Sequence, residues 1–485
     1  MDDDLAFVTA SRLAELVRTK KVGSVELLDF FAARIARLNP RLNAIIADRM
    51  DVARALCRQR DAQAARAAAD ELGPLHGIPM TIKESFDVPG LPTTWGLPEF
   101  RGNVAASPAT VVERLEAAGA VVFAKTNVPA NLADWQTFNP VYGVTNNPWN
   151  VERSPGGSSG GAAAALAAGL TPLEVGSDIG GSIRGPAHYC GVYGHKPTFG
   201  LVPRDGHTLP GTYSHGDMAV AGPLARSAED LRLTLEIITG PDAIDSRAMS
   251  LRLPAPAQRR LADFRVGVML TSPAADVDAS VQNEIDKLAG WLEAQGARVD
   301  RGDLGIDHAL LHETYIMLLR SATSRLIAPE AFERLSAARQ ASGGRSDYFA
   351  WQARGNTLSH VEWLKWDNLR HQMRCEWDRL FQRFDLLLCP AAATPAMRHN
   401  HQGERWERMI EVNGKDQPST TQMFWAAMAA MLFLPATVAP IARTGENLPV
   451  GIQIIGPQYA DLTCIAFARL LERDYRGFEP PPAFL

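Results

Sequence analysis

Cysteine is scarce in this chain and never paired. The 485 residues contain only five cysteines, all far apart in the sequence. None belongs to a Cys-x-x-Cys pair, the spacing used by zinc sites and redox motifs. An odd number of isolated cysteines also argues against a disulfide framework. We therefore predict free thiols, no metal site and a cytoplasmic protein. The five are Cys57, Cys190, Cys375, Cys389 and Cys464.

The chain also lacks a basic excess and a long apolar run. Its 49 Lys and Arg residues against 54 Asp and Glu give a net charge of −5, so the electrostatic footprint of a nucleic-acid binder is missing. The small-residue apolar run from Ala162 to Leu170 is far too short to span a bilayer. The acidic start, Met1 to Leu5, does not resemble a signal peptide, which would be basic and then apolar. We expect no nucleic-acid partner and no membrane segment.

What the sequence does contain is an alternation of strand-like and helix-like segments. Apolar runs at 80–83, 121–125 and 172–175 are separated by helical patterns at 108–118 and 162–168. This alternation is typical of α/β layering around a mixed or parallel sheet. The predicted fold class is α/β, with a large mixed β-sheet core covered by helices on both faces.

Helical patterns dominate the first 75 residues and the region after residue 300. Thr9 and Ser24 are the expected N-caps of the first two helices, and Pro40 is expected to close the second. Residues 305–430 show helical periodicity and carry six of the ten tryptophans. This region is predicted to be a helical insertion.

No internal repeat or low-complexity linker divides the chain, so we predict one domain over residues 1–485. Its expected parts are an N-terminal helical segment (1–75), a core (76–230), a helical insertion that forms the substrate pocket (about 300–430) and a C-terminal return to the sheet (431–485).

Two glycine-rich loops, each holding a serine, are the clearest functional signal. Ser158 lies within Gly156–Gly161, and Ser182 directly follows Gly181. Glycine lets a main chain turn sharply or approach a ligand closely. Such loops can also point backbone N–H groups at a developing negative charge. Upstream, Lys83 ends an otherwise apolar run. Serines, a candidate buried amine and glycine loops together indicate acyl transfer without a histidine.

Three better-known kinds of site, a nucleophile elbow, a P-loop and a catalytic histidine, fit this sequence less well. Gly156–Gly160 matches the GxSxG pattern literally, but a nucleophile elbow needs a preceding strand, and an Asn- and Pro-rich segment precedes it here. No Lys-Ser or Lys-Thr follows the glycines, which excludes a P-loop. His188, His195 and His207 have no obvious orienting carboxylate, and we interpret them as surface or core histidines.

The stretch from His76 to Gly200 resembles the amidase signature family, whose hallmark is a Ser-Ser-Lys triad. Lys83 matches the catalytic lysine of that family. Ser158 matches its bridging serine, which family members hold through a cis peptide bond, and Ser182 matches the nucleophile. The spacings agree with the family, since 75 residues separate Lys83 from Ser158 and 24 separate Ser158 from Ser182. Three further segments also resemble segments of that family: Gly222–Ser227, Leu388–Pro390 and Pro449–Gly456.

The resemblance implies a mechanism and further site residues. A neutral Lys83 would take a proton from Ser158, which would take one from Ser182 as Ser182 attacks the carbonyl. The implied oxyanion-hole donors are the N–H groups of Ile179, Gly180, Gly181 and Ser182. The implied supporting residues are Ser159, Asp178 and Arg184.

Some of these residues have structural alternatives. Ser158 or Ser159 could simply cap the helix expected at 162–168. The Trp and Met side chains after residue 350 could be core packing or could line a broad apolar pocket. Gly185 stands where many relatives carry a larger residue, which could widen the space beside the nucleophile. The candidate pocket residues are Trp135, Gly185 and Trp425.

The sequence therefore predicts a cofactor-free hydrolase of C–N amide bonds that acts on a small apolar or aryl amide. The same triad chemistry extends to carbamates (urethanes) and esters. A different class, the glutaminase subunit of a tRNA-dependent amidotransferase, would need carboxylate and hydroxyl groups for glutamine. Residues 130–136 do not look like that subunit's version. We expect a monomer or homodimer that takes a small-molecule amide or carbamate.

Overall fold

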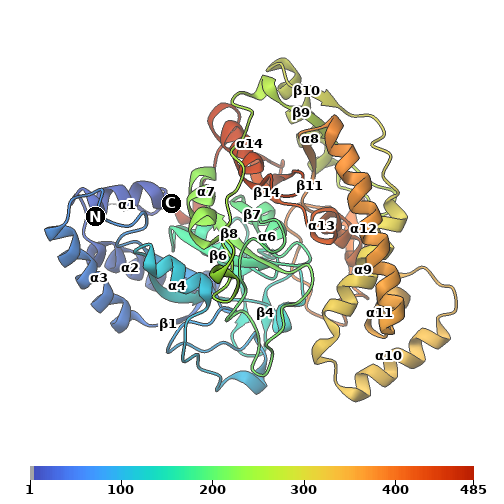
Figure 1. The fold of residues 1–485 in the computed structure, drawn as a ribbon, viewed down its shortest axis with the longest axis horizontal. Helices are drawn as coiled ribbons and strands as arrows, with labels where there is room; N and C mark the ends of the chain where they lie inside the picture. Colours follow the sequence, from blue (N-terminus) through green and yellow to red (C-terminus); the bar gives the residue numbers. More distant parts are fainter. Residues whose placement is uncertain (1–4) are drawn as a thin grey trace.

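An eight-stranded mixed sheet forms the centre of the computed structural model, which describes residues 5–485 (Figure 1). The strand order is β10-β9-β11-β15-β14-β7-β8-β6. Strands β10, β9 and β11 run parallel to each other, and the remaining neighbours pair antiparallel. The predicted large mixed sheet is confirmed. The strands are Leu173–Asp178 (β6), Tyr193–Lys196 (β7), Val220–Ala225 (β8), Arg265–Val268 (β9), Arg298–Asp300 (β10), Leu386–Pro390 (β11), Ala436–Arg443 (β14) and Pro449–Ile455 (β15).

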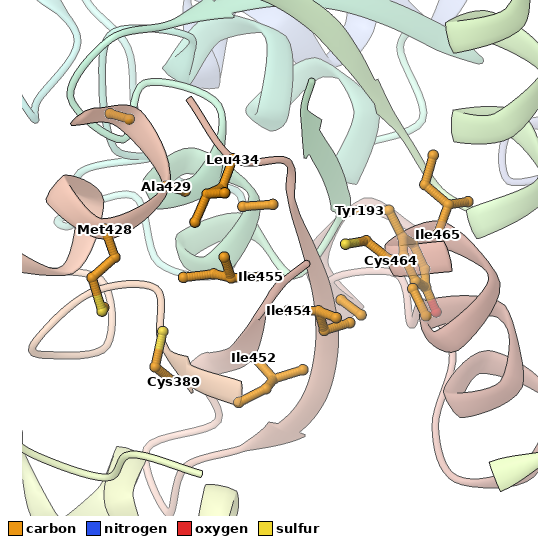
Figure 2. Close-up of a cluster of buried hydrophobic side chains, with 14 of the residues drawn as sticks. Tyr193, Cys389, Met428, Ala429, Leu434, Ile452, Ile454, Ile455, Cys464 and Ile465 are labelled. Carbon is orange, nitrogen blue, oxygen red and sulfur yellow. The ribbon is translucent and has the colours of Figure 1, made fainter. Parts of the chain in front are cut away.

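Helices cover both faces of this sheet, as predicted. On β7, a Cβ added to Gly194 would meet Ala187 of α6 (Arg184–Cys190), whereas the next residue, His195, bonds Asp461 of α14 (Asp461–Asp474). Because successive residues of a strand point to opposite faces, α6 and α14 lie on opposite sides. Figure 2 shows the same alternation on β15, where Ile455 lies toward α13 (Met423–Met431) and Ile454 toward α14.

A smaller sheet carries the lysine of the site. Its strand order is β1 (Ile45–Asp48), β3 (Val121–Thr126) and β2 (Pro79–Lys83), with β2 parallel to β3. Strand β2 also lies beside β6, and the Thr81 hydroxyl donates a 2.6 Å hydrogen bond to Glu174 on β6. The ends of β2 and β6 therefore lie close together. Strand β1 was not predicted from the sequence.

The N-terminal helices lie at one end of the molecule (Figure 1). Thr9 caps the first helix as predicted, since its hydroxyl accepts from the Arg12 N–H. The prediction for the second helix was wrong at both ends. Gly23 holds its N-cap position, and the chain stays helical through Pro40 until Asn43 adopts a left-handed conformation. The helices are Ala10–Arg18 (α1), Ser24–Leu42 (α2), Met50–Arg66 (α3) and Thr110–Ala117 (α4).

A group of helices from the region after residue 300 lies at the opposite end (Figure 1). The expected helical insertion is present between β10 and β11, and α9 packs against α11, α12 and α13. These helices are His308–Ala322 (α9), Pro329–Ala341 (α10), Tyr348–Asn356 (α11) and His360–Arg383 (α12). The remaining elements are α5 (Gly160–Ala167), α7 (Ala228–Ile238), α8 (Ala279–Ala294) and two hairpins, β4 (Phe138–Asn139) with β5 (Gly143–Val144) and β12 (Met409–Val412) with β13 (Lys415–Pro418).

Three further properties concern residues 5–485 as a whole. All five cysteines are free thiols, and only Cys375 is exposed. Across this range, the helices fall short of the length and apolarity needed to cross a membrane. No three His, Cys, Asp or Glu side chains there are grouped so that they could hold a metal ion.

Candidate active site

Strand and helix ends bring Lys83, Ser158 and Ser182 to one place. Lys83 is the last residue of β2, and each serine stands two residues before a helix, Ser158 before α5 and Ser182 before α6. Both serines line one cavity of about 1180 Å³. The two serine loops are tied together because the Ser159 N–H donates a 3.1 Å hydrogen bond to the Ser182 carbonyl. The structure thus gathers residues that are 99 positions apart in the sequence.

Lys83 is fully buried and contacts two hydroxyl groups. Its Nζ donates to Ser158 Oγ at 2.7 Å and to Ser177 Oγ at 2.9 Å. Burial lowers the pKa of Lys83 to about 7, although the carboxylates of Asp178, Glu174 and Glu84 act in the opposite direction. A large fraction of the amine is therefore neutral near pH 7. A neutral amine at this distance can accept the proton of Ser158.

Sequence reasoning missed two residues around the lysine. Ser177 supplies the second hydroxyl on Lys83, and its only sequence signal is its position directly before Asp178. Glu174 lies on the same strand, where burial raises the pKa of its carboxyl to about 8. Because this carboxyl is mostly neutral at pH 7, it favours the charged form of Lys83 less than an ionised carboxylate would. The alternation of β6 had given no signal for this acid, because every residue of the strand is buried.

The Gly157–Ser158 peptide bond is cis, as the family resemblance implies. Neither serine of this loop caps the following helix through its side chain. Ser159 occupies the N-cap position of α5 without a side-chain capping bond, and its hydroxyl donates instead to the Ser177 carbonyl at 3.4 Å. The supporting role predicted for Ser159 thus has a contact that connects the first serine loop to β6.

Two side chains fix the carbonyl groups of the loop before Ser182. The Tyr315 hydroxyl donates to the Ile179 carbonyl at 2.9 Å, and Trp135 Nε1 donates to the Gly180 carbonyl at 2.8 Å. In a trans peptide the C=O and the following N–H point in opposite directions. Holding these two carbonyls therefore also sets the directions of the next two N–H groups. Tyr315 comes from α9 and had no signal in the sequence.

The N–H groups of this loop differ in their availability. The Gly181 N–H donates to Asp178 Oδ1 at 2.9 Å, so it is engaged in this structure. Within residues 5–485, no acceptor pairs with the N–H groups of Ile179, Gly180 and Ser182. Three of the four predicted oxyanion donors are therefore free. The fourth, that of Gly181, is occupied because the carboxylate of Asp178 turns back onto its own loop.

Asp178 and Arg184 form a buried, bidentate ion pair. Arg184 Nη2 lies 2.9 Å from Asp178 Oδ1, and Arg184 Nε lies 3.1 Å from Oδ2. Burial opposes ionisation of Asp178, but the charge and hydrogen bonds of Arg184 and the Ile183 N–H outweigh it. The pKa of Asp178 is therefore held well below its usual value. Arg184 also donates to the Gln453 side chain at 2.7 Å. This pair holds the loop that carries Ser182 against the central sheet.

Replacing Arg184 with methionine is expected to lower the free energy of unfolding by about 3–5 kcal/mol, because the Asp178 charge would stay buried without a partner. Chemical denaturation monitored by fluorescence measures the change. The double variant Arg184→Met/Asp178→Asn should recover part of the loss. Arg232→Met, which removes a half-exposed arginine paired with Glu229, should change stability by less than about 1 kcal/mol. A loss of similar size in the two single variants would contradict this interpretation.

The Trp135 indole occupies the space that Gly181 and Gly185 leave. Gly181 has φ +93°, and a Cβ there would lie 2.8 Å from Cζ2 of Trp135, so only glycine is compatible with this close approach. A Cβ on Gly185 would lie 3.8 Å from the same ring. Trp135 lines the cavity, whereas Gly185 does not. The 3.8 Å distance is an ordinary van der Waals contact, so the indole does not require a glycine at 185, and Gly185 does not itself widen the cavity.

Trp425 is buried in the core and is not part of the cavity wall. It belongs to α13, in which all nine residues are buried. Because this helix has no polar face, its sequence could not indicate which side meets the cavity. Met423, at the start of the same helix, does line the cavity. After residue 350, the tryptophans are therefore absent from the cavity wall, whereas Met397, Met409 and Met423 line it.

The three histidines considered above are all buried, and one of them does have an orienting carboxylate. His195 Nε2 lies 3.1 Å from Asp461 Oδ1, which comes from a helix 266 residues further on. His195 is not among the cavity-lining residues. His207 does line the cavity, where its Nε2 lies 3.0 Å from the Ser85 hydroxyl. Burial lowers the pKa of His207 well below its usual value, so this imidazole is neutral.

The cavity wall combines apolar side chains with arginines. The apolar group includes Trp95, Trp135 and Met423. Seven arginines also line the cavity, against five Asp and Glu residues. The arginines are Arg153, Arg204, Arg320, Arg325, Arg398, Arg405 and Arg408.

The fold and the geometry of this site define the class of the protein. A family model described as Amidase matches residues 26–465, and the chain belongs to the amidase signature family, whose members are amide hydrolases. This confirms the resemblance seen in the sequence.

Curated relatives of the chain include two different kinds of protein. A glutamyl-tRNA(Gln) amidotransferase subunit of Symbiobacterium thermophilum is 30% identical, over 98% of this chain and 98% of the relative. Indoleacetamide hydrolase of Bradyrhizobium diazoefficiens is 31% identical, over 95% of this chain and 85% of the relative. Among solved structures, a bacterial aryl acylamidase of the same family superimposes with a TM-score of 0.79 at 26% identity, covering 96% of both chains.

Proposed function

We propose that this chain hydrolyses a C–N amide bond through a serine acyl-enzyme, with Ser182 as nucleophile and Ser158 and Lys83 as its proton relay. The observation that carries this proposal is the 2.7 Å contact between the buried Lys83 amine and the Ser158 hydroxyl, at the wall of a cavity that Ser182 also lines. A serine hydroxyl is a weak nucleophile unless a base stands within hydrogen-bond reach.

The proposed reaction begins with attack of Ser182 Oγ on the amide carbon. The Oγ–C bond forms, the Ser182 proton passes to Ser158, and the Ser158 proton passes to the neutral Lys83. When the C–N bond breaks, the proton returns through Ser158 to the leaving nitrogen. Water then attacks the ester by the same relay and releases the acid and Ser182.

The free N–H groups of the nucleophile loop would stabilise the negative charge that develops on the carbonyl oxygen. Those of Ile179, Gly180 and Ser182 are unengaged in the described chain, and hydrogen bonds to Tyr315 and Trp135 fix the loop that carries them. Donors held in position before the reaction are worth most, because they need no reorganisation as charge develops.

The apolar part of the wall supports a small aryl or apolar amide as substrate. Trp95, Trp135 and Met423 offer flat or adaptable surfaces on the wall of the cavity that both serines line. Carbamates and esters form the same acyl-enzyme type, so hydrolysis of either is the alternative on the same residues.

A second candidate is the glutaminase component of a tRNA-dependent amidotransferase. The 30% identity to the Symbiobacterium thermophilum amidotransferase protein, over nearly the full length of both chains, favours it. The bulky Trp135 beside the nucleophile loop favours a free-standing hydrolase with an apolar site instead.

Assays on the purified chain without any partner separate these functions. A panel of aryl amides, aliphatic amides, carbamates and p-nitrophenyl esters is used together with glutamine, and size-exclusion chromatography reports whether the active species is a monomer or a homodimer. We expect hydrolysis of aryl amides by the chain alone. Turnover of glutamine only, and only after a partner protein is added, would replace the proposed function with the second candidate.

A further inference from the structure

Arg320, on the cavity wall, is buried with neither a counter-charge nor an oxygen acceptor among the described residues. Arg320 lies near the end of α9 and is 7% exposed. Its Nε has no hydrogen-bond acceptor in residues 5–485, and its Nη2 contacts only the Met423 sulfur, at 3.9 Å. No Asp or Glu of the described chain forms an ion pair with it. The guanidinium thus has N–H groups without an oxygen acceptor in the described chain, and it lines the cavity.

A buried arginine without a counter-ion lowers the stability of the folded protein. Burying an unpaired cation costs several kcal/mol, and the Tyr348 ring, 5.8 Å from the guanidinium carbon, compensates only weakly. Burial lowers the pKa of Arg320 to about 10, so the group is still a cation at neutral pH. Four other buried arginines reach oxygen acceptors, whereas Arg320 reaches only a sulfur. Arg184 and Arg370 pair with Asp178 and Asp217, and Arg204 and Arg226 donate to main-chain carbonyls. The contrast indicates a role that needs the unpaired charge.

A second guanidinium reinforces the positive charge. Arg405 lines the same cavity, and its Nε also lacks an acceptor within residues 5–485. Its other nitrogens reach only neutral oxygens, the Ala133 carbonyl at 2.7 Å and the Gln352 side chain at 3.5 Å. The charge of Arg405 adds to the lowering of the pKa of Arg320, so the two cations influence one another. Two like charges without a carboxylate favour an anion between or beside them.

A single side chain separates Arg320 from the nucleophile loop. Met423 Sδ is 3.9 Å from Arg320 Nη2, and Met423 Cε would be 3.8 Å from a Cβ added to Gly180. Tyr315, five residues before Arg320 on α9, donates to the Ile179 carbonyl of the same loop. Arg320 therefore stands on the side of the cavity next to Ile179 and Gly180.

We propose that the substrate of this site is an amide that carries a carboxylate, and that Arg320, assisted by Arg405, binds that carboxylate. The planar guanidinium can donate two parallel hydrogen bonds to a carboxylate, which gives both affinity and orientation. The inference rests on the proposed function and narrows it. The apolar wall would hold the body of the amide while the arginines select its charged end.

Binding to the Ser182→Ala variant tests the inference without chemistry. Calorimetry compares succinanilic acid with butyranilide, which has nearly the same shape but ends in a methyl group where the acid has a carboxylate. We expect the acid to bind at least about 10-fold more tightly. Adding Arg320→Met should weaken binding of the acid about 10–100-fold, the value of a charge-assisted hydrogen bond, and leave butyranilide unchanged. Arg320→Lys should restore part of the difference.

Two controls separate recognition from folding. Arg398 also lines the cavity, but its side chain is 70% exposed and paired with Glu152, so Arg398→Met should leave the preference for the acid intact. Without ligand, Arg320→Met should keep or raise the thermal midpoint, because it removes an unpaired buried cation. Equal affinities for the two anilides, or an equal loss for both in Arg320→Met, would overturn the inference.

Hydrolysis by the unmodified enzyme distinguishes this inference from the proposed function. If it cleaves both anilides with equal kcat/KM, carboxylate recognition is wrong and the amidase function stands. If Ser182→Ala binds the acid selectively and the unmodified enzyme cleaves neither anilide, the proposed function fails and carboxylate recognition stands.

Discussion

Replacing Ser182 with alanine is expected to lower the turnover of an aryl amide about 10⁴–10⁶-fold, as loss of the nucleophile does in other serine hydrolases. The Oγ that attacks the carbonyl would be absent, and neither Ser158 nor Ser177 stands at the end of the N–H loop to replace it. The variant should fold normally, because the Ser182 contact between the loops uses its main-chain carbonyl, not its side chain. Steady-state kinetics and the thermal midpoint check both statements.

A fluorophosphonate probe identifies the nucleophile directly. Intact-mass spectrometry and peptide mapping should place the label on Ser182 in the unmodified chain and find none in Ser182→Ala. Ser177→Ala is the matched control, since it removes another cavity-lining hydroxyl that contacts Lys83. Its label should still map to Ser182. Undiminished labelling of Ser182→Ala would refute the assignment of the nucleophile.

Replacing Lys83 with methionine is expected to lower turnover roughly 10²–10⁴-fold, the usual contribution of a general base. Methionine has nearly the same length but cannot accept the Ser158 proton. Because the relay acts as a unit, Lys83→Met combined with Ser182→Ala should be no slower than Ser182→Ala alone. The pKa of Lys83 is lower in the folded chain than its ordinary value of 10.5, so the buried charge opposes folding below that pH. Removing it should therefore not lower the thermal midpoint, which chemical or thermal unfolding can check.

The pH dependence of kcat/KM in the unmodified enzyme independently measures the pKa of the same general base. Only the neutral amine is competent, and the pKa of Lys83 is about 7, so kcat/KM should fall about tenfold per pH unit below pH 7 and level off above it. Lys196 is the control, because burial also lowers its pKa to about 7 while its amine donates only to the carbonyls of Pro197 and Leu434. If the acid limb disappears in Lys196→Met and persists in Lys83→Met, the base has been assigned to the wrong lysine.

The site concentrates groups that cost stability. Lys83 is a buried amine next to a mostly neutral Glu174, and Arg320 is a buried cation without a counter-ion in the described chain. Asp178 and Arg184, by contrast, satisfy one another. Proteins commonly retain such costly groups where activity requires them. This pattern gives the expectation that Lys83→Met and Arg320→Met weaken function without weakening the fold.

The sequence alone determined the features that depend on local pattern. The positions of Lys83, Ser158 and Ser182 could be predicted because each stands in a short motif whose glycines or apolar neighbours are adjacent in the chain. The α/β class, the helical insertion and the cap at Thr9 followed from periodicity and from single residues with strong local preferences. The end of α2 was misplaced because a left-handed Asn43, not Pro40, stops the helix.

Only the tertiary structure decided which distant residues meet at the serines. Ser177 and Glu174 lie on a strand that is buried throughout, so no alternation marked the side that faces Lys83. Tyr315 and Arg320 come from α9, more than 130 residues after Ser182. Only the packing of that helix brings Tyr315 to the loop before Ser182 and Arg320 to the cavity. Trp425 and Trp135 have the same side chain, but tertiary packing places Trp425 in the core and Trp135 against the loop before Ser182. Local structure depends on residues that are adjacent in the chain, and can therefore be predicted from the sequence. A cavity is formed by contacts between segments that are far apart in the sequence, and therefore depends on tertiary packing.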